Sequence, residues 1–441
     1  AAGARAAFEQ ALSKDADYLP AVTALARLDL ADKQPEAARA RFEALVQRNP
    51  RNGAAHIALA ELGQRAGARR EVVAAQLEAG IAANPDDASL RLALVGHHLA
   101  TVNPKAAAGA AQAALAQLPD HVELLARLGQ AQLQTGDTRQ ALTIYGRLVT
   151  LQGKAPAAHL GLAEAQMAAD DLPGAGRSVA RALELEPDLL PARRMQVQLA
   201  LRQRQPDKAL AVARQLQKQR PALAAGFLLE GEVQIAQQRW QPAVAALRQA
   251  VAKAEPQEAP MRLHHALLRA GQTADAEAMA AGWTKAHPQD LLFLFHLGDE
   301  ALIRRDFPTA ETRYRAVLAI KPDHALALNN VAWLLLQQKK PGALDMAERA
   351  VKASPDQPAL RDTLAQAMAA EGRLRPAVEM QQSALALRPD DPGLRLNLAR
   401  LYALADEKRL ARTELERLAL LGDRFGRQAE VAAALKALRG R

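Results

Sequence analysis

Apolar and polar positions along the 441-residue chain repeat with a period of about 34 residues. A proline that ends a helical stretch marks most periods, while Gly153 fills one gap and Ala16 extends the series backwards. Successive markers lie 32 to 35 residues apart over eleven intervals, and this regularity is typical of a helical repeat array. The marker prolines are Pro50, Pro85, Pro119, Pro187, Pro221, Pro256, Pro288, Pro322, Pro355 and Pro389.

Each period contains two small residues at fixed places. Ala or Gly comes about ten residues after the marker, and Ala comes about 22 residues after most markers. A large residue often follows four later, as in Tyr145 and Tyr314, where it can fill the hole between neighbouring repeats. Between the two small residues lies a turn with Pro or Gly-Asp, and proline is tolerated in the first turn of a helix. Each unit is therefore predicted to be a helix A, a short turn and a helix B.

This pattern resembles the tetratricopeptide family over essentially the whole chain. The residues that carry the resemblance are Leu128-Gly129, Ala141, Tyr145, Leu297-Gly298, Ala310, Tyr314 and Pro322. The resemblance implies an all-α, right-handed superhelical solenoid of antiparallel helix pairs. We expect a partial repeat with only a helix B at 1–15, about twelve repeats at 16–423, and a capping helix at 424–441. Because an array that opens mid-repeat exposes an apolar face, we also expect the chain to be a piece of a longer protein.

Composition and charge narrow the function classes. The 57 basic residues exceed the 48 acidic ones by nine, and the excess is spread along the chain. A nucleic-acid-binding protein usually concentrates positive charge on one face, so nucleic acid is a disfavoured partner. The absence of cysteine excludes disulfides, thiol catalysis and thiolate metal sites. No apolar run is long enough to span a bilayer, and no signal peptide is visible.

No group of residues forms a catalytic motif, so we predict a protein that is not an enzyme and needs no metal or cofactor. Gly174-Ala175-Gly176 lacks the Lys-Ser/Thr of a phosphate-binding loop. The histidine pairs His97-His98 and His264-His265 are adjacent, and adjacent residues point to different sides of a helix. Acidic pairs such as Asp86-Asp87, Asp170-Asp171 and Asp390-Asp391 are predicted to cap helices.

Binding is the predicted activity, because the family commonly holds peptides in a groove lined by the A helices. The residue eleven after each marker is expected to face that groove, and this row is mainly polar. Trp333 could anchor a partner or pack on the next repeat, and Asn329 and Asn330 could hydrogen-bond a ligand. The row is Arg27, Glu61, Gly96, Gln130, Glu164, Gln198, Glu232, Leu267, Asp299, Trp333, Gln366 and Arg400, to which we add Arg194, Arg202 and Asn329 as binding candidates.

Two charge patterns were compared with known modes of recognition. Residues 193–220 hold eight basic residues against Asp207 alone, so this segment could contact an acidic protein or an anionic polysaccharide, or could be a solvated face. Some tetratricopeptide arrays hold a peptide carboxylate with a Lys/Asn/Arg clamp. Asn329 lacks basic residues at the neighbouring groove positions, so the clamp is not transferred to this chain.

The last three repeats resemble a narrower group, the tetratricopeptide lipoproteins of the bacterial exosortase (PEP-CTERM) system, which accompany exopolysaccharide production. The residues that carry this resemblance are Leu328 to Leu335, Arg361 to Leu364, and Gly422 to Phe425. It implies a periplasmic scaffold, with a membrane contact only through a lipid anchor upstream of Ala1. The alternatives are the periplasmic array of a cellulose-type exporter, the regulatory array of a larger enzyme such as an O-GlcNAc-type glycosyltransferase, and a cytoplasmic location.

Overall fold

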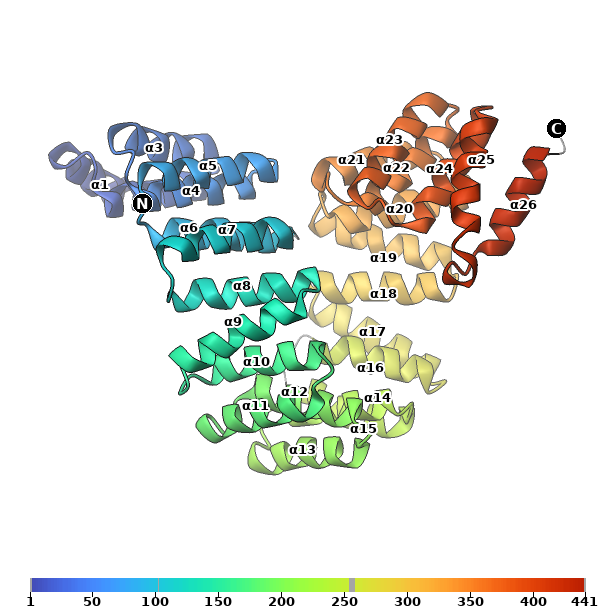
Figure 1. The fold of residues 1–441 in the computed structure, drawn as a ribbon, viewed down its shortest axis with the longest axis horizontal. Helices are drawn as coiled ribbons and strands as arrows, with labels where there is room; N and C mark the ends of the chain where they lie inside the picture. The colour runs from blue at the N-terminus through green and yellow to red at the C-terminus, as the bar shows by residue number, and fades with distance from the viewer. Residues whose placement is uncertain (1, 102, 254–257, 440–441) are drawn as a thin grey trace. The chain divides into compact units, whose positions relative to one another are not determined.

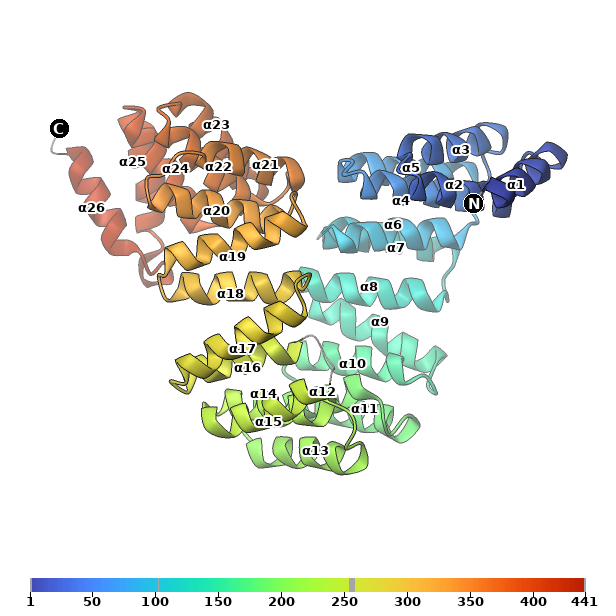
Figure 2. The same ribbon diagram turned by 180° about the vertical axis from the view of Figure 1, so that it is seen from behind.

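The structure is a computed structural model that describes residues 2–101, 103–253 and 258–439. Throughout these described residues the secondary structure is helical, without a β-strand (Figures 1 and 2). The chain divides into two compact units. The N-terminal unit comprises residues 1–239 and 252–255, and the C-terminal unit comprises residues 240–251 and 256–441. Each unit is described by itself.

The N-terminal unit opens with one helix and continues as six packed A–B pairs and a further helix A. Each helix has 12 to 14 residues, which is about four turns. The helices are α1 (Ala2–Lys14), α2 (Leu19–Ala31), α3 (Pro35–Arg48), α4 (Gly53–Arg65), α5 (Arg70–Ala83), α6 (Ala88–Ala100), α7 (Pro104–Gln117), α8 (Val122–Thr135), α9 (Thr138–Leu151), α10 (Pro156–Ala168), α11 (Leu172–Leu185), α12 (Leu190–Arg202), α13 (Pro206–Gln219) and α14 (Ala225–Ala236).

The C-terminal unit begins with a helix B and continues as five packed A–B pairs and a last helix, α26. Its helices are α15 (Trp240–Ala252), α16 (Glu258–Arg269), α17 (Thr273–Ala286), α18 (Leu291–Ile303), α19 (Phe307–Ile320), α20 (Ala325–Gln337), α21 (Ala343–Ala353), α22 (Pro358–Ala370), α23 (Leu374–Leu387), α24 (Pro392–Leu404), α25 (Lys408–Ala419), the 3-10 turn η1 (Gly422–Arg424) and α26 (Gln428–Arg439). Along the described chain, A and B helices alternate twelve times from α2 to α25, as the 34-residue period predicts.

The small residues of the period lie where the helices touch. Every alanine predicted at about 22 residues after a marker in the described chain, from Ala38 to Ala411, is fully or almost fully buried. Tyr145 shows why the spacing matters: its ring fills the space between Gly129 on α8 and Gly161 on α10, and a Cβ on Gly129 would lie 2.7 Å from the ring. One aromatic side chain thus joins two consecutive repeats, and side-chain burial of this kind supplies most of the stability of short helices.

The turn between helix A and helix B requires one residue in the left-handed region. Gly136 adopts it with φ of 81°, and glycine does so without steric cost. Lys33 and Arg305 occupy the equivalent place in other repeats, with φ of 60° at both. A non-glycine residue there costs of order 1 kcal/mol, so the packing of the two helices overrides local preference in those repeats.

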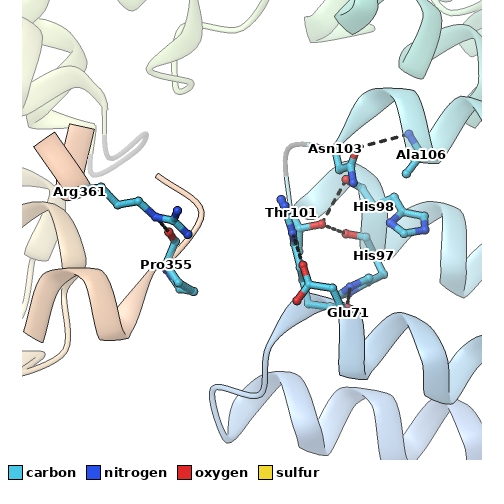
Figure 3. A network of polar contacts seen from close by, with 9 residues as sticks. Glu71, His97, His98, Thr101, Asn103, Ala106, Pro355 and Arg361 are labelled. Atoms are coloured by element: carbon cyan, nitrogen blue, oxygen red, sulfur yellow. Dashed lines mark hydrogen bonds and ion pairs between the residues drawn. The ribbon is translucent and has the colours of Figure 1, made fainter. Parts of the chain in front are cut away.

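A basic side chain six residues after the marker fastens several inter-repeat loops. Arg361 Nε donates to the Pro355 carbonyl at 2.8 Å, as labelled in Figure 3. Arg193 donates to the Pro187 carbonyl at 3.1 Å, and His159 Nε2 lies 2.9 Å from the Gly153 carbonyl. These groups satisfy carbonyls that the ends of helices leave unpaired. This repeated contact was not predicted from the sequence.

Among the described helices, none combines the length and the apolar character that a bilayer span requires.

Candidate binding groove

A groove of about 800 Å³ opens along three successive A helices of the N-terminal unit, α8, α10 and α12. Apolar side chains lie on its floor, with Tyr145 buried at 6 % exposure and Leu160 and Met195 half-buried. Polar side chains, including Gln130 and Glu164, stand around it. An apolar hollow of this size with a few polar groups is typical of a binding site.

Glu164 gives the groove its electrostatic character. This exposed carboxylate has no ion-pair partner among the residues that the structure describes, whereas Glu123 on the same rim lies 3.7 Å from Arg127. Burial raises the pKa of Tyr145 to about 12, and the negative charge of Glu164 contributes to the rise. The Tyr145 hydroxyl therefore stays protonated, and the groove presents one uncompensated negative charge above an apolar floor.

The structure brings two of the predicted binding residues, Gln130 and Glu164, together in this groove. The other exposed residues of the predicted set lie on other A helices or, for Arg202, at the end of α12. Arg202 donates to the Met167 carbonyl at 2.7 Å. The remaining exposed candidates are Arg27, Glu61, Gln198 and Arg400. Those that are half-buried are Arg194, Glu232, Asp299, Asn329, Trp333 and Gln366. Gly96 is half-buried as well.

Leu267 is a wrong member of the row, because it is completely buried and cannot contact a ligand. It lies in α16, which belongs to the unit that is two residues short in the sequence. Trp333 is half-buried and meets Phe307 edge to face, with ring centroids 5.9 Å apart. It packs on the preceding helix B and not on the next repeat, and part of its surface stays exposed.

The 193–220 segment is less positive in the structure than in the sequence. Arg220 forms an ion pair with Asp188, and Arg214 lies 3.1 Å from Glu230, and both acidic residues lie outside the counted interval. Arg193 is occupied by the Pro187 carbonyl, as described above. Contacts with partners distant in sequence thus reduce the charge available to an acidic ligand.

The C-terminal unit has its own polar cluster on the A helices. The Tyr314 hydroxyl donates to Asp299 Oδ1 at 2.6 Å. Asp362 on α22 accepts hydrogen bonds from Gln366, Gln381 and Asn397. Sequence reasoning missed Asp362, Gln381 and Asn397. Asp362 and Asn329 stand seven residues after their markers, one helical turn before the predicted row, so the i,i+4 rule could have found Asp362.

The histidine pairs are held by internal contacts. His97 is buried and its Nε2 lies 2.9 Å from the Arg70 carbonyl, while Thr101 donates to the His97 carbonyl at 2.9 Å (Figure 3). His264 Nδ1 lies 3.1 Å from His296 Nε2, and His265 Nδ1 lies 2.7 Å from Glu300 Oε1. Across residues 2–101, 103–253 and 258–439, no three such side chains are placed to hold a metal ion.

Comparison with known families decides the origin of this architecture. One family model described as tetratricopeptide repeat matches residues 1–62, and a second matches residues 126–189, 194–259 and 297–358, together more than half of the chain. The chain belongs to the tetratricopeptide-repeat family. Its 34-residue period, its buried small residues and its helix pairs are those of tetratricopeptide arrays.

Solved structures with a similar tetratricopeptide fold include yeast Tom70, with 11 % identity over 89 % of this chain and 96 % of that chain, and a TM-score of 0.49. A tetratricopeptide repeat protein from Parabacteroides merdae has 14 % identity over 56 % of this chain and 97 % of that chain, with a TM-score of 0.44. The APC/C hetero-tetramer Cut9-Hcn1 has 12 % identity over 98 % of both chains, with a TM-score of 0.41. A search of curated proteins found no significant match.

Proposed function

We propose that this tetratricopeptide array is a non-catalytic interaction scaffold whose N-terminal unit binds an extended segment of a partner protein. The groove along α8, α10 and α12 is the observation that supports it. Tetratricopeptide arrays generally bind peptides or proteins, and this groove combines an apolar floor with polar groups at its rim. Fold alone does not assign a partner, so the proposal is based on the groove.

The lining indicates the chemistry of the bound segment. An apolar side chain of the partner would cover Tyr145, Leu160 and Met195, and burying one such side chain contributes about 1.5–3 kcal/mol. Gln130 can donate to and accept from a peptide backbone. Glu164 favours a basic residue next to that apolar side chain, because opposite charges attract at a partly desolvated rim.

A peptide display library selected on the full chain tests this proposal. Selected peptides are expected to carry an apolar residue beside a basic one, and Leu160→Arg is expected to weaken their binding at least tenfold. Leu151→Arg is the matched control, since Leu151 is an exposed leucine of the same unit that does not line the groove. Equal affinity of both variants for the selected peptides would contradict the assignment of the groove.

For the cellular role we propose a periplasmic scaffold linked to exopolysaccharide production or exosortase-type sorting. Its support is the resemblance of the segments around Trp333, Asp362 and Phe425 to the exosortase-associated lipoproteins. A cellulose-type exporter and a larger enzyme with a regulatory array are the alternatives. The reading frame around residues 1–441 separates them: a lipobox cysteine upstream supports the first role, a strand-rich region downstream the second, and an enzyme domain the third. A frame without an export signal would overturn both periplasmic roles.

A further inference from the structure

The carboxylate of Asp362 is held by three neutral amides from three consecutive helices. Gln381 Nε2 on α23 donates to Oδ1 at 2.6 Å, and Asn397 Nδ2 on α24 donates to the same oxygen at 2.8 Å. Gln366 Nε2 on α22 donates to Oδ2 at 2.8 Å. Gln381 is fully buried, at the place where Tyr145 and Tyr314 stand in their repeats. The side chain of Asp362 is therefore fixed in position.

These amides orient the carboxylate but do not neutralise it. No lysine or arginine of the described chain lies within ion-pair distance of Asp362, and the nearby Arg427 holds both oxygens of Glu430, at 2.7 and 2.8 Å. Burial raises the pKa of Asp362, and the three amide hydrogen bonds offset only part of that rise. A carboxylate has about four acceptor positions, and three are occupied here. One position on Oδ2 remains open, and the residue is only half-buried.

The surrounding polar atoms are mostly acceptors. Gln381 Oε1 and Asn329 Oδ1 are buried without a hydrogen-bond partner among the described residues. The Gln381 amide cannot be turned around to satisfy Oε1, because its Nε2 already donates to two acceptors, Asp362 Oδ1 and the Leu394 carbonyl. Asp299, two A helices earlier, adds a second carboxylate whose pKa is raised by burial. A surface rich in acceptors is complementary to a ligand rich in donors.

We propose that Asp362 anchors a cationic side chain, a lysine or arginine, of a basic segment of a partner protein that lies along α18, α20 and α22. Ammonium and guanidinium groups are donors only, so they match the open acceptors. Trp333, on α20 between the two carboxylates, presents an indole that can contact the cation. The proposal shares the protein-binding role proposed above but lies in the C-terminal unit, so either can fail without the other.

Binding of labelled hexaarginine and hexalysine to the full chain tests the proposal, with hexaglutamate as the comparison. The chain has a net charge of +9, so general electrostatics favours hexaglutamate, and tight binding of a polycation requires a local acidic site. We expect both polycations to bind and Asp362→Asn to weaken them at least tenfold. Asp345→Asn on α21 is the matched control, because it removes the same charge from an exposed site on a helix B and should leave affinity unchanged.

Asn329→Asp and Asn329→Lys decide the question if Asp362→Asn fails to fold. They add opposite charges at the neighbouring groove position without removing any hydrogen bond to Asp362, so the first should strengthen hexaarginine binding several-fold and the second should weaken it. A stronger hexaarginine complex than hexalysine complex would identify guanidinium as the preferred group. The proposal is overturned if neither polycation binds, if Asp362→Asn binds as the unmodified chain does, or if the two Asn329 variants do not differ.

Discussion

The buried histidine pair of the C-terminal unit makes that unit sensitive to acid. His264 on α16 is 4 % exposed and His296 on α18 is half-buried, and their facing nitrogens are 3.1 Å apart. Burial lowers the pKa of both rings to about 4. Arg304 adds to the effect on His264, while Glu300 partly opposes the effect on His296. Both rings are therefore neutral in the folded unit at pH 7, and one N–H donates to the other ring.

The sign and size of the effect follow from proton linkage. In the unfolded chain each histidine has a pKa near 6.5, so it takes up a proton below that pH while the folded unit does not. The stability that the neutral pair contributes is complete above pH 6.5 and is lost as the pH falls towards 4. A pKa difference of about 2.5 corresponds to about 3 kcal/mol per ring below pH 4, and to about 2 kcal/mol per ring at pH 5.

Tryptophan fluorescence is a suitable assay, because all three tryptophans of the chain, Trp240, Trp283 and Trp333, belong to the C-terminal unit. Denaturant unfolding is followed at pH 7.5 and pH 5 for the unmodified chain and for the double variant His264→Phe/His296→Leu. Replacing both partners with apolar side chains of similar size leaves no unpaired nitrogen. We expect the unmodified chain to lose 2–4 kcal/mol more than the double variant between the two pH values.

A histidine variant elsewhere controls for the loss of a titrating group as such. His121→Asn in the N-terminal unit keeps a side chain that can cap α8 and should leave the pH dependence of the tryptophan transition unchanged. If the double variant loses as much stability at pH 5 as the unmodified chain does, the pair is not the acid-sensitive group and the reasoning is refuted.

Two further predictions concern the N-terminal unit. Asp29, 1 % exposed, joins Arg5 on α1 to Arg41 on α3 at 2.6 and 2.5 Å; Asp29→Asn should lower the local opening free energy of α1 to α3 by about 3 kcal/mol, because two guanidiniums lose their partner. Burial alone would raise the pKa of Asp29, but the Arg41 and Arg5 hydrogen bonds hold it below its usual value, so this contribution is present at neutral pH and disappears as the pH falls below about 4; hydrogen exchange that is unchanged at pH 7 would contradict it. Gly136→Ala should destabilise its repeat by about 1 kcal/mol, because φ is 81° and no atom lies near the added Cβ; an unchanged melting temperature would show that the turn relaxes without cost.

The repeat architecture could be predicted from the sequence because it depends on local and periodic features. The spacing of the marker prolines sets the length of each unit, and alanines such as Ala141 and Ala310 lie at helix contacts because only small residues permit that approach. The groove-facing row was predicted by the same periodicity, and Gln130 and Glu164 do line the N-terminal groove. The error at Leu267 has a physical reason, since a shortened unit changes which face of its helix A is covered.

The chemistry of the surfaces was decided by the tertiary structure. Residues far apart in the sequence determine whether a charge is free: Asp188 and Glu230 reduce the positive charge of the 193–220 segment, whereas Asp362 receives amides and no cation. Sequence spacing states which helix face a residue occupies, because that depends on a period of 3.6 residues. It does not state which side chains of neighbouring repeats meet that face, and these contacts set burial, pKa and the open acceptor beside Asp362. The sequence by itself thus determined the array and its period, and only the packing of one repeat on the next decided where this protein presents a site.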